Sequence, residues 1–427
     1  MRIILQDSSD FQEQLKPLLN RSAFDPQIDK SVAQILADVK ANGDAALVEY
    51  AKRFDHVDLT PETFRVISLD NVPAIDDETI QAIKTAVDHV SAFSRQRIPQ
   101  AWSFSPREGV TLGEQFAPLD RVGCYIPGGT APLISTVIHT VAIAKAAGVK
   151  EIVVVTPPAK DGNINPAVLN ACKIAGATEV YKLGGVYAVA ALGYGTQTIR
   201  KVQKIVGPGN AYVTAAKRQL YGEVALDLVA GPSEIMVLAD KTANPAYVAA
   251  DVLSQAEHGS GREQAVLIST DKELITKVQA EIAEQAAKLS RVECVQKVLA
   301  NGVFLIEAKS REQAAELANF YAPEHLEIDM ENPEEIAKKI TSCGAIFLGP
   351  WTPEPVGDFV AGPSHVLPTG GSGRFFSGLT VETFFRRMSV VKYDRPALMR
   401  DLPYIKTFAR NEGLDAHGNS AAIRETR

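Results

Sequence analysis

The sequence predicts an α/β protein built on parallel sheets. From about Arg121 onward, short runs of β-branched residues alternate with segments of helical periodicity. These runs are apolar along nearly their whole length, which is typical of parallel strands covered by helices on both faces. The runs lie at 151–155, 202–206, 234–238, 264–268, 303–306 and 345–348. With 427 residues, the chain is long enough for two large domains and a small appendage.

Helices are predicted before and between these strands. The part up to about Gln100 is mostly helical by its apolar spacing, which is clearest in 32–39. Two later helices have legible starts, because Asn244-Pro245 and Asn332-Pro333 each place a capping Asn before a Pro suited to the first turn.

Glycine-rich turns follow several of the predicted strands, on the side where α/β sheets bind ligands. They are Gly128-Gly129, Gly184-Gly185, Gly207-Pro208-Gly209-Asn210 and Gly231-Pro232-Ser233. None has the G-x-G-x-x-G spacing of the usual dinucleotide site, so tight turns are the simpler interpretation of these glycines taken alone.

The C-terminal region after Gly370-Gly371-Ser372-Gly373 is predicted to be an appendage. These residues indicate a flexible joint, and the tail beyond them, 374–427, is too short for a robust core of its own. The tail nevertheless carries Phe375, Phe376, Phe384 and Phe385. We expect it to pack on another surface, either the body of the same chain or a partner subunit.

Composition excludes several classes of protein. A net charge of −7 without a basic block argues against nucleic acid as a partner. No apolar stretch is long enough for a membrane span, and the N-terminus lacks the apolar region of a signal peptide, so we expect a cytoplasmic protein. The cysteines form no C-x-x-C pair, and Cys124 stands in a predicted strand, where a buried inert thiol is expected.

Four of the seven histidines lie in the last 170 residues, among polar, Gly or Pro neighbours. Carboxyl or amide side chains stand close to them in sequence, and imidazoles with carboxylates supply both metal ligands and acid/base pairs. The histidines are His258, His325, His365 and His417, and the neighbouring groups are Gln255, Glu324, Asp358 and Glu412. An enzyme is therefore the leading hypothesis.

Gln255 and His258 are three residues apart at the end of a helix that should stop at Gly259, so both project from one face. Alone, the pair also fits an ordinary solvated helix end. With Asp358 and His417 added, two nitrogens and two oxygens suit zinc or a similar ion with open positions for substrate.

Glu324-His325 stands between a predicted helix, 310–321, and a predicted strand. Adjacent residues at such a junction can both reach one cleft, where a carboxylate and an imidazole offer bases of different strength. The plainer interpretation is a surface Glu and a His bonded to backbone.

Taken together, a series of motifs in this order resembles the histidinol dehydrogenase family over nearly the whole chain. Each motif is short, and their order along the chain makes the resemblance specific. They are Arg121-Val122-Gly123 through Pro127-Gly128-Gly129-Thr130-Ala131-Pro132, Gly207-Pro208-Gly209-Asn210-Ala211, Ala230-Gly231-Pro232-Ser233-Glu234, 254–259, 321–326 and His365-Val366-Leu367-Pro368-Thr369.

The resemblance implies an activity and its cofactors. The reaction is the four-electron, NAD-dependent oxidation of L-histidinol to L-histidine through L-histidinal, the last step of histidine synthesis, with one zinc ion per subunit. Carried over by motif, the zinc ligands are Gln255, His258, Asp358 and His417, and these residues together with His325 also contact the substrate. Glu324 would activate water and His325 would be the general base.

The resemblance also assigns the remaining contacts. Ser233, His365 and Glu412 would position the substrate, with Glu412 near its imidazole. Tyr125, Tyr187 and Asn210 would touch the dinucleotide. The family usually has a Gln that contacts the dinucleotide where this chain has Tyr187 in Gly184-Gly185-Val186-Tyr187-Ala188.

The implied fold is two incomplete Rossmann-like domains with a small, mostly helical C-terminal domain exchanged across a homodimer. We expect an N-terminal arm at 1–22, a first domain from 23–123 and 234–373, a second domain at 124–233, and the tail 374–427 completing the partner's active site. Three alternatives stay open: an NAD-dependent dehydrogenase of another small amino- or sulfo-alcohol, a zinc hydrolase, and a non-catalytic metal-binding module.

Overall fold

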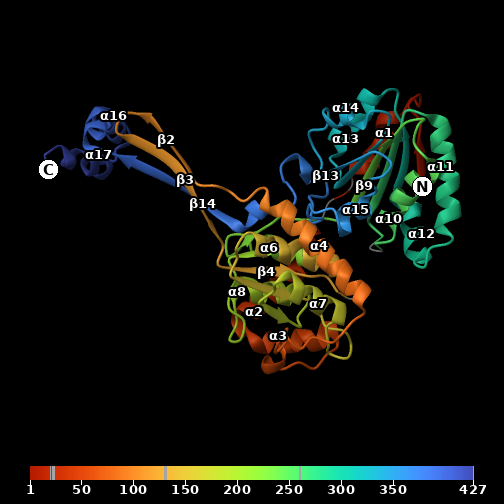
Figure 1. The fold of residues 1–427 in the computed structure, drawn as a ribbon, viewed down its shortest axis with the longest axis horizontal. Coiled ribbons are helices and arrows are strands. Elements are labelled where there is room, and N and C mark those ends of the chain that lie inside the picture. Colours follow the sequence, from red (N-terminus) through yellow and green to blue (C-terminus); the bar gives the residue numbers. More distant parts are fainter. Residues whose placement is uncertain (20, 22–24, 129–131, 259–260, 427) are drawn as a thin grey trace.

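The computed structural model describes residues 1–427 except 20, 22–24, 129–131, 259–260 and 427. It has two parallel sheets covered by helices and an antiparallel ribbon that extends away from them (Figure 1). The α/β prediction with parallel sheets is therefore confirmed. None of the helices in the described residues is long and apolar enough to cross a membrane.

One sheet has five parallel strands in the order β6-β5-β4-β7-β8. Its strands are β4 (Arg121–Tyr125), β5 (Glu151–Val155), β6 (Glu179–Tyr181), β7 (Lys204–Val206) and β8 (Ala225–Leu226). Side chains alternate between its faces, so Val153 and Val155 enter one core and Ile152 and Val154 enter the other. Both faces are buried, as the apolar run 151–155 predicted.

Helices from two parts of the chain cover this sheet. One face carries α2 (Pro26–Asn42), α3 (Asp44–Tyr50), α8 (Gly185–Tyr194) and α9 (Ala211–Gln219). The other carries α4 (Asp77–Arg95), α5 (Ile134–Val137), η4 (Ile138–Ala142), α6 (Ile143–Ala146) and α7 (Pro166–Ala175). Residues 26–95 thus pack on the five-stranded sheet, whereas we had grouped 23–123 with 234–373. The apolar stripe of α2, which includes Val32 and Leu36, is buried against α8 and α9 and so fixes this grouping.

The second sheet has six parallel strands in the order β1-β11-β10-β9-β12-β13. These are β1 (Arg2–Ile4), β9 (Glu234–Ala239), β10 (Gln264–Ser269), β11 (Val303–Glu307), β12 (His325–Asp329) and β13 (Ala345–Leu348). One face is covered by α10 (Pro245–Ala256), α11 (Lys272–Ala286) and α12 (Val292–Asn301). The other is covered by α1 (Phe11–Leu15), η1 (Lys16–Leu19), α13 (Arg311–Tyr321) and α14 (Pro333–Ala337). The N-terminal arm therefore supplies the edge strand β1 of this sheet, and its helices α1 and η1 cover part of one face.

The ribbon consists of β2 (Trp102–Arg107), β3 (Val110–Pro118) and β14 (Phe385–Tyr393), all antiparallel. At its far end, away from both sheets, lie α16 (Arg395–Glu412) and α17 (Asp415–Ala422) (Figure 1). The tail is thus helical only in part, because it also contains the nine-residue strand β14, which connects the body to α16. Phe384 is buried in the core of the five-stranded sheet, while Phe375 is exposed.

Short elements complete the connections. They are the π-helical turn η2 (Ala51–Asp55), η3 (Pro61–Thr63), α15 (Glu354–Phe359), η5 (Ser372–Arg374), η6 (Val381–Phe384) and η7 (Ile423–Glu425). The predicted joint is held in place rather than free: Gly370 donates its N–H to the Glu234 carboxylate at 3.0 Å, and Ser372 is buried. Gly370 and Gly371 have φ of +63° and +78°, a conformation that favours glycine.

Candidate active site

Most of the expected acid/base and metal-binding residues of the body lie at the amino edge of the six-stranded sheet. Glu324 and His325 stand where the chain enters β12, and Gln255 stands at the end of α10, which leads into β10. Ser233 directly precedes β9. The turn Gly231-Pro232-Ser233 therefore lies between the carboxyl end of β8 in the five-stranded sheet and the amino end of β9 in the six-stranded sheet.

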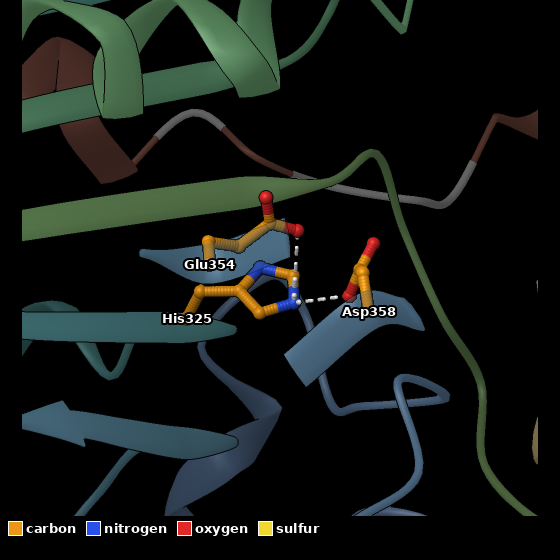
Figure 2. Close-up of side chains that lie close together, drawn as sticks. All are labelled: His325, Glu354 and Asp358. Atoms are coloured by element: carbon orange, nitrogen blue, oxygen red, sulfur yellow. Dashed lines mark ion pairs between the residues drawn. The ribbon is translucent and has the colours of Figure 1, made fainter. Parts of the chain in front are cut away.

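His325 is nearly enclosed, with 3% of its surface exposed. Its Nδ1 lies 3.0 Å from the backbone oxygen of Glu234, so Nδ1 carries the proton and donates it to that carbonyl. Its Nε2 lies 3.5 Å from Oδ1 of Asp358 and 3.9 Å from Oε1 of Glu354 (Figure 2). Burial by itself lowers the pKa of His325, but the surrounding carboxyl groups raise it to about 10.

Glu324 is buried beside this imidazole. Its Oε2 accepts a hydrogen bond of 2.9 Å from the backbone N–H of Glu234 and lies 3.8 Å from Nδ1 of His325. Burial raises the pKa of Glu324 to about 8, and His325 opposes that rise. Gly344 makes room for this arrangement, because a Cβ there would lie 2.4 Å from the backbone oxygen of Glu324. The plain interpretation, a surface Glu, does not fit this burial.

Glu354 and Asp358 project from α15 toward Nε2 of His325 (Figure 2). They are four residues apart and so lie on one helix face. Burial raises the pKa of Glu354 to about 8. Burial also acts to raise the pKa of Asp358, but the imidazoles of His325 and His365 hold it well below its usual range. We had not predicted Glu354, and its spacing from Asp358 is the signal that could have revealed it.

Gln255 is fully buried, and neither atom of its amide has a hydrogen-bond partner among the described residues. An amide buried in this way needs a partner that those residues do not supply, which fits a metal or substrate ligand. Its neighbour Ser254 donates to Glu354 at 3.4 Å, so the end of α10 meets α15 here. His258 is exposed just beyond the helix end, and Gly259, where we expected the helix to stop, lies outside the described residues.

His365 reaches the same place from the loop after α15. Its Nδ1 lies 3.1 Å from the backbone oxygen of Asp358, and its buried Nε2 has no partner among the described residues. Its ring stacks on that of His139, with centroids 4.5 Å apart. His139 lies in η4 and is fully buried, and burial lowers its pKa to about 3. We had not predicted His139, because it stands in the apolar run 137–143 like a core residue.

Glu412 and His417, in contrast, are exposed on α16 and α17 at the far end of the ribbon (Figure 1). Within one chain the structure does not bring these two residues to Asp358 or Gln255. Among the described residues, the three closest metal-binding groups are instead His325, Glu354 and Asp358, whose ligand atoms lie within 4.8 Å of one another. That triad is a second way in which a metal could be held.

The residues expected near the dinucleotide lie on the five-stranded sheet. Tyr125 ends β4, and its hydroxyl accepts the N–H of Gly185 at 3.1 Å. Asn210 caps α9 by accepting the N–H groups of the first turn. Tyr187 is buried and donates its hydroxyl to Asp55 while accepting from Gly184. In the structure Tyr187 is thus a packed side chain with protein partners. Gly129, in the first glycine turn, lies outside the described residues.

Cys124 is fully buried in β4, and burial raises its pKa to about 12. The prediction of a buried thiol is confirmed. A thiol with so high a pKa stays protonated near neutral pH and is a poor nucleophile.

Comparison with known proteins places the whole chain in one family. The family model described as histidinol dehydrogenase matches residues 19–425. Histidinol dehydrogenase of Heliobacterium mobile is 43% identical, covering 99% of this chain and 99% of its own, and that of Synechococcus is 42% identical, covering 99% and 98%.

Solved structures agree with the sequence relatives. The crystal structure of histidinol dehydrogenase from Elizabethkingia anophelis aligns with a TM-score of 0.93 at 38% identity, covering 100% of this chain and 98% of that one. Aldehyde dehydrogenase 21 from Physcomitrella patens is similar in fold alone, with a TM-score of 0.51 at 11% identity over 90% of this chain and 89% of that one. Because full-length relatives and the family model agree, the chain belongs to the histidinol dehydrogenase family of NAD-dependent oxidoreductases.

Proposed function

We propose that this chain oxidises L-histidinol to L-histidine through L-histidinal, with two NAD molecules accepting one hydride each. The observation that carries the proposal is the buried pair Glu324 and His325, placed beside Asp358 and the unpartnered amide of Gln255. A non-catalytic metal-binding module would have no use for an acid/base pair enclosed in this way.

His325 is the general base for the alcohol. With Nδ1–H donated to the Glu234 carbonyl, Nε2 is the ring atom that exchanges protons with the substrate. Burial lowers the pKa of His325 but the surrounding carboxyl groups raise it to about 10, so Nε2 must lose its own proton before it can act as the base. As hydride leaves the carbinol carbon for the nicotinamide, Nε2 takes the hydroxyl proton, and the product is the aldehyde.

Glu324 is the base for water. Its carboxylate takes a proton from water as the oxygen adds to the aldehyde carbon, while the carbonyl oxygen receives the proton that Nε2 of His325 took in the first step, which gives a gem-diol. Hydride transfer from this gem-diol to a second NAD, with one hydroxyl proton taken by Nε2 of His325, gives the carboxylic acid. The Glu234 N–H fixes the carboxyl, and burial raises its pKa to about 8, so its ionised form is a stronger base than an ordinary glutamate.

The zinc ligands are Gln255, His258, Asp358 and His417. The unpartnered amide of Gln255 and the low pKa of Asp358 fit this donor set. When bound, zinc holds the substrate so that its carbinol carbon faces the nicotinamide, a positioning role. Measuring zinc in His258→Asn tests the set: this variant should lose zinc and stay folded. Full zinc content would favour the alternative triad of His325, Glu354 and Asp358.

Ser233, His365 and Glu412 position the substrate. His365 suits this role in the body, because its Nδ1 is directed to the Asp358 carbonyl and its Nε2 is left for a ligand. Tyr125 and Asn210 contact the dinucleotide at the carboxyl ends of the five-stranded sheet, where α/β sheets bind such ligands. Tyr187 acts on the dinucleotide site indirectly, through its hydrogen bonds to Asp55 and to the turn at Gly184.

The tail completes the active site of a partner. Exposed Glu412 and His417 lie on a ribbon directed away from the body, and a symmetric homodimer with exchanged tails would bring each to the other body.

The activity is tested by incubating the purified protein with L-histidinol and NAD while NADH and histidine are both measured. We expect two NADH per histidine. The same assay with a panel of small amino- and sulfo-alcohols is the control for substrate. Faster turnover of one of those alcohols, or a single NADH per product, would contradict the proposal.

A further inference from the structure

A single residue outside the proposed acid/base pair contacts both of its members through the main chain. Glu234 begins β9, which pairs in parallel with β12, and Ile235 is in register with His325. The N–H of Glu234 donates to Oε2 of Glu324 at 2.9 Å, and its carbonyl accepts from Nδ1 of His325 at 3.0 Å. The position of this one peptide segment therefore sets the position of both bases.

The side chain of Glu234 is fixed by parts of the chain that are distant in sequence. Oε2 accepts from Arg21 at 2.8 Å, and Oε1 accepts the N–H of Gly370 at 3.0 Å. The ion pair is buried, with 6% of the Arg21 side chain and 3% of the Glu234 side chain exposed. The N-terminal arm and the glycine joint that precedes the tail thus meet at this carboxylate.

Arg21 is itself held on a second side. Its other terminal nitrogen donates to the backbone oxygen of Tyr321. Its guanidinium carbon lies 3.7 Å from the centre of the Tyr321 ring. The hydroxyl of Tyr321 donates to Gln264 at 2.8 Å, and Gln264 is the register partner of Glu234 on β10. The planar guanidinium of Arg21 therefore links β9 to the end of α13. That helix ends at Tyr321, shortly before Glu324 in the chain.

We infer that Arg21 and Glu234 are positioning residues, whose buried ion pair holds the Glu234 main chain where it orients both Glu324 and His325. The inference rests on the proposed roles of those two bases. A displacement of about 1 Å in such groups can lower a rate roughly 100-fold, so a fixed main-chain anchor has a direct kinetic consequence. Arg21 reaches neither base itself, and its effect passes through Glu234.

The test is Arg21→Gln, assayed with L-histidinol and with L-histidinal at a temperature where the variant is folded. We expect kcat to fall at least about 10-fold on both substrates, because both bases lose their anchor. KM for NAD should stay within about 2-fold, and zinc content should not change, because the proposed metal and dinucleotide contacts lie elsewhere.

Arg121→Gln is the matched control. Arg121 forms a buried pair with Glu179 at 2.7 Å, but at the amino end of β4 on the other sheet. This variant should lose thermal stability and keep its kcat. A kcat in Arg21→Gln that equals that of the wild type, or a loss no greater than in Arg121→Gln, would overturn the inference. So would loss of zinc or a raised KM in place of a lowered kcat.

Two conservative variants cover the case in which Arg21→Gln does not fold. Arg21→Lys keeps the charge, but one ammonium cannot reproduce the planar contact with both Glu234 and Tyr321, so an intermediate kcat is expected. Glu234→Gln keeps the shape and loses the charge, and should lower kcat in the same way. Wild-type kcat in both variants would reject the positioning role.

Failure of the catalytic roles is distinguishable from failure of this inference. If Glu324→Gln and His325→Gln keep full activity, the proposed roles are wrong. If those variants are impaired and Arg21→Gln, Arg21→Lys and Glu234→Gln are not, only the positioning role is wrong.

Discussion

His325 and His417 are expected at the same active site, yet the structure surrounds them in opposite ways. His325 is enclosed between two strands and α15, with Nδ1 bonded to the backbone and Nε2 facing two carboxyl groups. His417 is exposed on α17 at the end of the ribbon (Figure 1). In the body, the acid/base groups are already held in position without a ligand. In the tail, the side chains are exposed and need a second protein surface to form a site.

The difference between body and tail is tested most directly by finding which chain supplies His417 to each active site. We expect His258→Ala and His417→Ala each to be inactive alone, because each lacks a proposed zinc ligand. When subunits of the two variants are exchanged, a mixed dimer has one site with an intact body and an intact tail. Activity should return, to at most about half per mixed dimer by two-fold symmetry.

Heterodimers are verified by differently tagged chains, and reassembled wild type is the control. If verified mixed dimers show no activity, both ligands come from one chain. His417 would then have to reach the body of its own chain when the ligand binds.

The next effect concerns the two bases in the body. His325→Gln should slow both oxidation steps, since removing a general base typically lowers a rate roughly 100- to 10,000-fold. Glu324→Gln should impair oxidation of L-histidinal far more than the first hydride transfer, because an amide cannot deprotonate water. Single-turnover rates with each substrate measure the difference, and equal losses for Glu324→Gln on both substrates would argue against separate roles.

A pH profile sharpens the same contrast with a smaller effect. Burial raises the pKa of Glu324 to about 8, so the carboxylate needed for water addition becomes more abundant as pH rises through that value. Because His325, with its pKa raised to about 10, also contributes to the rise, oxidation of L-histidinal should have a limb below pH 8 that is about 10-fold per pH unit steeper than the rise above pH 8. Glu324→Gln should lack this limb, and a flat wild-type profile from pH 6 to 9 would contradict the assignment.

The smallest expected change is at Tyr187. Tyr187→Phe removes the hydroxyl that donates to Asp55, so this partly buried carboxyl loses a partner. We expect a loss of about 1–3 kcal/mol in stability, measured by denaturant unfolding, and a change of less than 10-fold in KM for NAD. A large rise in that KM with unchanged stability would show instead that the hydroxyl contacts the dinucleotide directly.

The sequence alone predicted most strands of the two parallel sheets, because β-branched runs are local signals, but not β1, β6, β8 or the antiparallel ribbon. The roles of Glu324 and His325 came from the resemblance, since the dipeptide alone favoured the plainer interpretation. The expected first domain grouped residues 26–95 with 234–373, whereas these residues cover the five-stranded sheet. The amphipathic stripe of α2 fits either sheet, and only its packing against α8 decides. Glu354 and His139 were missed for a related reason: their contacts with His325 and His365 join residues far apart in the chain. The glycine joint was predicted to be flexible because its hydrogen bond to Glu234 cannot be read from composition.

The edge position of β1 determines when the site can be completed during synthesis. Among the described residues β1 pairs with β11 alone, about 300 residues later in the chain, whereas the helices and strands of the five-stranded sheet lie largely within 26–226. At 5–20 residues per second, the N-terminal segment waits roughly 15–60 s for its strand partner to emerge from the ribosome. Arg21 can meet Glu234 early, but Gly370 closes the arrangement only when the chain is nearly finished. The order of translation therefore leaves the acid/base edge open until the glycine joint before the tail is made.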